Sequence, residues 1–199
     1  MKLTTLLIGL AAMSASLPAA TILFGGGGSE GSSVSFGPVT ATGYTNNGVL
    51  GTLFGKGSAG TGSEDGLGLT NDPTGCPSAC NNEIFAGTNF IQLSITGLSG
   101  PISISLASTG GDGWAVYGTN SAGTLVGATS LATGGSDDGA EVSLPTATSY
   151  AYLDIKATSN NILLQDLVYS SSVPEPGTLG IVGLGGVLIG LLRRKVRQS

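Results

Sequence analysis

The sequence predicts an all-β protein: an antiparallel β-sandwich of jelly-roll-like type, placed between two apolar ends. Three observations support this fold class. No window shows sustained apolar periodicity of 3.6 residues, many short runs alternate apolar and polar residues, and 35 glycines in 199 residues separate those runs. Evenly spaced short strands with turn signals between them are typical of sandwiches. We therefore expect a leader at 1–20, the sandwich at 21–169, and a linker with an apolar tail at 170–199.

The clearest strands are predicted at 90–95 and 102–106. In each run every second residue is apolar, and the intervening residues 96–101 are rich in glycine, serine and proline. This arrangement predicts a hairpin. Further strands are expected at 33–36, 49–54, 114–117, 124–128, 140–144, 150–155 and 162–169. The aromatic residues Trp114, Tyr117, Tyr150 and Tyr152 are interpreted as core or corner packing.

Charge and composition exclude several functions. The chain has no histidine, which excludes a His-based catalytic triad and a Cys/His zinc site. Residues 21–173 carry two lysines against eleven carboxylates, a net charge of −9. Such an acidic domain does not attract nucleic acid. No motif for a catalytic nucleophile is present, so we expect no enzymatic activity.

The first 20 residues have the order of a secretory signal peptide. Met1 and Lys2 give a positive start, residues 3–12 are mostly apolar, and small residues follow up to Ala20. The apolar run is too short to span a bilayer. We expect export, with cleavage after Ala20, or alternatively after Ala19 or Ser16.

The C-terminal end has the pattern of a short membrane anchor. Residues 177–192 are uncharged and would extend about 24 Å as a helix, against about 30 Å for the hydrocarbon core. A basic cluster follows, formed by Arg193, Arg194, Lys195 and Arg197. Positive charge stays on the cytoplasmic side, so the residues before the anchor are expected outside.

The motif Val173, Pro174, Glu175 and Pro176, the apolar segment 177–192 and the basic cluster 193–197 together resemble the PEP-CTERM sorting tail. The same tail is also labelled an ice-binding protein C-terminal domain. The resemblance implies a Gram-negative bacterium that makes exopolysaccharide, and an exosortase as partner. This membrane protease-transpeptidase would cleave near 173–176 and release the protein from the inner membrane to the surface. The order of motifs from Glu64 to Asn120 also resembles uncharacterised PEP-CTERM proteins with β-sandwich ectodomains.

Carboxylates gather in the turns of the middle segment. Solvated turn residues are the favoured interpretation, while a structural Ca²⁺ and a catalytic carboxylate pair stay open as alternatives. The candidate calcium ligands are Glu64, Asp65, Asp72 and Glu83, which flank one long loop. No other cofactor is expected.

Two cysteines, Cys76 and Cys80, lie in the same turn-rich stretch. In an exported protein without further cysteines they are expected to form a disulfide. So small a loop contributes only about 2 kcal/mol, so the bond would stiffen the loop rather than hold the fold.

These observations favour a cell-surface or matrix protein, structural in a biofilm or exopolysaccharide matrix. A carbohydrate-binding, lectin-like module is the alternative, by analogy with other sandwiches. Ice binding and carboxylate-based glycoside hydrolysis are weaker alternatives.

Overall fold

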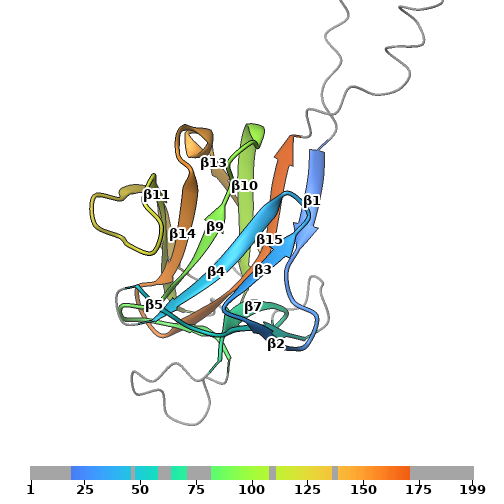
Figure 1. Cartoon of the computed structure of the whole chain (residues 1–199), viewed down its shortest axis with the longest axis vertical. Coiled ribbons are helices and arrows are strands. Elements are labelled where there is room, and N and C mark those ends of the chain that lie inside the picture. Colours follow the sequence, from blue (N-terminus) through green and yellow to red (C-terminus); the bar gives the residue numbers. More distant parts are fainter. Residues whose placement is uncertain are drawn as a thin grey trace, which may run out of the picture.

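The computed structural model describes residues 19–45, 48–57, 64–70, 82–107, 111–135 and 139–170. These residues form two antiparallel sheets with a shared core, and one short 3₁₀ turn, η1 (Ala147–Ser149) (Figure 1). The predicted antiparallel β-sandwich is confirmed. No helix in these ranges is long and apolar enough to cross a membrane.

The first sheet is built around the long strand β15. Its strand order is β13 (Glu141–Leu144), β10 (Ser99–Ala107), β15 (Asn161–Ser170), β7 (Gly66–Leu69), β6 (Leu53–Lys56) and β2 (Gly28–Gly31). The strands β1 (Ala19–Leu23) and β8 (Ile84–Phe85) also pair with β15. The first and last described strands are therefore neighbours, with Ala19 opposite Ser170.

The second sheet carries the buried polar side chains of Gln92 and Asp154 on its outer face. Its strand order is β12 (Thr129–Gly135), β11 (Gly113–Thr119), β14 (Tyr152–Ala157), β9 (Phe90–Ser94), β4 (Val39–Thr45) and β3 (Ser33–Phe36), and β5 (Val49–Leu50) pairs with β4.

The core lies between the sheets and follows the alternation of the strands. In β14, Leu153 and Ile155 are fully buried and face inward, so Asp154 between them faces outward. In β10, Ile102 and Ile104 contribute to the same core from the opposite sheet. Burying one such side chain stabilises the fold by about 1.5–3 kcal/mol.

The predicted hairpin at 90–106 is wrong. β9 lies in the second sheet between β14 and β4, whereas β10 lies in the first sheet between β15 and β13. The chain turns after β9, where the Leu98 N–H donates to the Ile95 carbonyl at 3.0 Å, and it then crosses to the other layer. Alternation defines the inward face of a strand but not its neighbour, and two strands in opposite sheets both face one core.

Other differences concern local structure. Residues 124–128 form a turn rather than a strand, closed by the Ala128 N–H to the Leu125 carbonyl. The predicted strand 49–54 is split into β5 and β6, which lie in different sheets. Strand β4 was not predicted, because two of its four buried positions, Ala41 and Gly43, carry small residues that weaken the hydrophobic pattern.

Several predictions lie outside the described residues. These are the leader up to residue 18, the disulfide Cys76–Cys80, and the tail with its motif 173–176, its apolar segment 177–192 and its basic cluster 193–197. The described chain begins at Ala19, inside the predicted leader, with Ala19 and Ala20 paired to β15.

Candidate functional site

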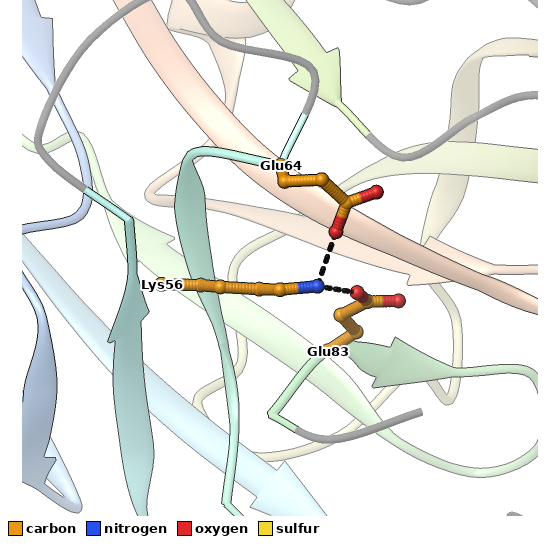
Figure 2. Close-up of polar contacts among 3 residues, drawn as sticks. All are labelled: Lys56, Glu64 and Glu83. Carbon is orange, nitrogen blue, oxygen red and sulfur yellow. Dashed lines mark hydrogen bonds and ion pairs between the residues drawn. The ribbon is translucent and has the colours of Figure 1, made fainter. Parts of the chain in front are cut away.

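The first polar cluster contains Lys56, Glu64 and Glu83. The Lys56 ammonium, at the end of β6, contacts one carboxylate oxygen of each glutamate (Figure 2). The side chain of Glu83 is 3% exposed and that of Glu64 is 61% exposed. Burial alone would lower the pKa of Lys56, but hydrogen bonds to Glu64 and Glu83 outweigh it and raise that pKa above its usual value. The ammonium therefore stays charged and neutralises a buried carboxylate.

A glycine allows Glu83 to approach the sheet. Gly68 in β7 pairs with Phe54 in β6, two positions from the pair formed by Lys56 and Gly66. A Cβ at Gly68 would overlap the carbonyl oxygen of Asn82 and lie 2.7 Å from the Cα of Glu83. Only glycine leaves room for this backbone to cross β7 so closely.

This geometry bears on the four candidate calcium ligands. Glu64 and Glu83 meet at one point, but the Lys56 ammonium holds the central position there. Asp65 lies against Gly57, and Asp72 is outside the described residues. Within the described ranges, no group of three or more Asp, Glu, His or Cys side chains is arranged to hold a metal ion. Lys56 was missed as part of this cluster, because its contact with Glu83 joins residues 27 positions apart.

The second cluster lies on the outer face of the second sheet. Gln92 in β9 and Asp154 in β14 point away from the core, yet they are only 3% and 0% exposed. The segment 120–128 after β11, here called the covering loop, lies over them. The side-chain amide of Gln92 donates to the Ser121 carbonyl at 3.2 Å and accepts from the Gly123 N–H at 3.1 Å. Gln92 thus fastens the loop to the sheet.

Asp154 is a buried carboxyl with one hydrogen-bond donor. Its Oδ1 accepts from Gln92 Nε2 at 2.8 Å, and its Oδ2 has no partner among the described residues. Burial raises the pKa of Asp154 from 3.8 to about 7, and the hydrogen bond from Gln92 only partly opposes this shift. A raised pKa indicates a functional carboxyl only when it also faces a cleft, and Asp154 lies beneath the loop.

A hollow of about 520 Å³ opens beside this cluster, within the size range of small-ligand sites. Two of its lining residues, Phe90 and Lys156, come from the sheet, and three come from the covering loop: Thr124, Leu125 and Val126. Tyr44 stacks on Phe90 with ring centroids 5.0 Å apart. None of the five lining residues is a carboxylate, and Lys156 makes no ion pair with any described residue.

The aromatic interpretation holds for Trp114, which is 3% exposed and packs in the core. Besides Lys56, the site residues that sequence reasoning missed are Gln92, Asp154 and Lys156. Their outward positions predict solvated side chains, whereas Gln92 is buried where it hydrogen-bonds to the covering loop and Asp154 is buried beside Gln92.

Comparison with known proteins identifies the tail. Residues 172–197 match the family described as the PEP-CTERM protein-sorting motif. This match confirms the resemblance drawn from Val173 to Pro176. It indicates an exported protein with a membrane-anchored precursor in a Gram-negative cell, targeted to an exosortase. No curated protein matches the chain.

Proposed function

We propose that this chain is a non-catalytic structural protein of the cell surface or extracellular matrix, released from the inner membrane by exosortase cleavage near 173–176. The observation that carries the proposal is the position of the last strand. β15 ends at Ser170, and the sorting motif matches from residue 172. Cleavage near Glu175 therefore removes no residue of the described core.

The proposal of a non-catalytic domain rests on the surroundings of its carboxylates. Glycoside hydrolysis needs two carboxyls across a substrate cleft, one of them with a raised pKa. Asp154 has such a pKa, but it is 0% exposed beneath the covering loop. Glu64 and Glu83 are held by Lys56, and the hollow beside the loop is lined by no carboxylate. These features support a role in binding or structure.

The test measures in which cell fraction the protein is found and where its C-terminus lies. In an exosortase-competent strain, intact-mass analysis of the surface and matrix fractions should find a chain that ends near 173–176. The variant Glu175→Ala should remain in the inner membrane at full C-terminal length. Glu30→Ala, a change in the peripheral strand β2, should be released normally.

Two outcomes would contradict the proposal. One is normal release of Glu175→Ala, which would remove the sorting motif from the mechanism. The other is turnover of a polysaccharide by the purified protein that disappears when one Asp or Glu is changed while the fold is kept.

A further inference from the structure

We propose that the hollow between the covering loop and β14 binds the acidic sugar residues of a polysaccharide, with Lys156 pairing with a uronate carboxylate. The inference rests on the proposed function, because it names the matrix component that the domain would contact. The positive charge of Lys156 is the first observation that supports it.

Among the residues that the structure describes, Lys156 is the cation that remains available. Residues 21–173 contain two lysines and no arginine or histidine, and Lys56 is held between two glutamates. Lys156 lines the hollow and makes no ion pair with a described residue. Because the net charge of this segment is −9, an anion is not attracted over long range. It binds only where a local cation meets it, and Lys156 provides that position.

Large apolar side chains are exposed on the covering loop, which lines the hollow, and on the adjoining strand β5. Val126 on the covering loop is 85% exposed, and Val49 and Leu50 in β5 are 59% and 60% exposed. The two segments lie side by side, because a Cβ at Gly48 would come within 2.5 Å of the Gly123 carbonyl oxygen. Three of the four large hydrophobic side chains that are exposed in the described ranges thus belong to these neighbouring segments. Apolar side chains exposed on two adjoining segments support a binding surface at this place.

Together, the Lys156 ammonium and the apolar side chains beside it determine which kind of ligand can bind. An occupant must present one negative group to Lys156 and an apolar face to Leu125 and Val126. The ring of a uronate does both, since its axial C–H bonds form an apolar face and its carboxylate lies at the edge. Thr124 supplies a hydroxyl for a sugar oxygen: its Oγ1 accepts from the Val126 N–H at 3.1 Å, so its own O–H can donate to the ligand.

An acyl chain fits the same surface less well. Val126 stands almost fully in solvent, so the wall it forms does not enclose an apolar chain on all sides. A solvated polysaccharide that places one or two of its sugar units in the hollow is compatible with that exposure. Gln92 supports the site from below, because it fastens the loop that carries Thr124, Leu125 and Val126.

The experiment uses the exported full-length protein, purified in a mild nonionic detergent, and measures binding of galacturonate oligomers by calorimetry. The neutral control is a glucose oligomer of equal length. Binding of the acidic oligomer is expected, with the affinity lowered about tenfold in Lys156→Gln and retained in Lys156→Arg. Val126→Ser should also weaken binding, while Leu23→Ser, a matched change at a 42% exposed residue in the other sheet, should not. Thermal melting shows that each variant is folded.

The inference is overturned if folded wild-type protein binds neither oligomer, if both oligomers bind equally, or if Lys156→Gln binds as wild type does. It is also overturned if a fatty acid or an apolar peptide competes for Lys156 more strongly than the uronate. Failure of the proposed function is separate, because it is measured by the release of Glu175→Ala and does not depend on any sugar.

Discussion

Replacing Asp154 with asparagine should remove most of the pH dependence that this carboxyl gives to unfolding. Asparagine has nearly the same shape, and its side-chain oxygen can still accept the hydrogen bond that Gln92 Nε2 donates at 2.8 Å. It cannot ionise. The substitution therefore isolates the cost of placing a charge beneath the covering loop, where Asp154 is 0% exposed.

The magnitude follows from the pKa of Asp154, which burial raises from 3.8 to about 7. Between these values the unfolded chain has lost the proton and the folded chain keeps it. The folded state binds more protons there, so the free energy of unfolding falls as pH rises through this window and is level above it. Each pH unit contributes about 1.4 kcal/mol, which gives a total loss of up to about 4 kcal/mol.

The assay is urea unfolding of the exported protein at several pH values between about 5 and 8. Burial also raises the pKa of Asp166, so wild type and variants share part of the slope. The difference between wild type and Asp154→Asn is therefore the measured quantity. Glu30→Gln in β2 serves as the control and should keep the wild-type slope. An equal slope in wild type and Asp154→Asn would refute the reasoning.

The remaining predictions concern the ion-pair cluster and its glycine. Glu83→Gln should lower the free energy of unfolding by about 2–3 kcal/mol, because it removes the 3% exposed partner of Lys56, whereas Glu64→Gln at a 61% exposed side chain should cost less than about 1 kcal/mol. Equal losses in urea unfolding would contradict this difference. Gly68→Ala should cost about 3 kcal/mol or prevent folding, since its Cβ would overlap the Asn82 carbonyl oxygen; an unchanged melting temperature would disprove the close crossing. Melting temperatures in calcium and in EDTA should agree, because the Lys56 ammonium already holds both glutamates. A rise with calcium would support the metal site instead.

The sequence predicts which residues face inward far better than it predicts which strands pair. Alternation in β9 and β10 identified Ile91, Leu93, Ile102 and Ile104 as core residues, and all four are buried. The pairing of the two strands was wrong, because a turn between them is compatible with either a hairpin or a crossing between sheets. The missed strand β4 has Gly43 at an inward position, where a Cβ would lie 2.6 Å from the Leu69 side chain. Because the close packing against Leu69 requires glycine at this inward position, the alternation of apolar and polar residues in β4 is interrupted there.

The candidate site was harder to predict than the fold, for a related reason. Gln92 and Asp154 lie at outward positions of alternating strands, where the pattern predicts contact with water. Their burial depends on the covering loop, and residues 124–128 had been expected to form a strand. The ion pair between Lys56 and Glu83 depends on a close crossing at Gly68, which no local pattern encodes. By contrast, the sorting motif at 173–176 is contiguous in sequence and could be recognised directly.

The pairing of β1 with β15 has a consequence for the timing of folding during export. β15 is the last described strand, and β10, β1, β7 and β8 all pair with it. The first sheet therefore cannot close until the chain up to Ser170 is available for pairing. Contacts between such distant residues form slowly, so β1 keeps an open edge until β15 pairs with it. The tail begins directly after β15, and its arrest in the bilayer would hold the emerging domain at the membrane during this step. Anchoring would then give the sandwich time to close before an exosortase frees it.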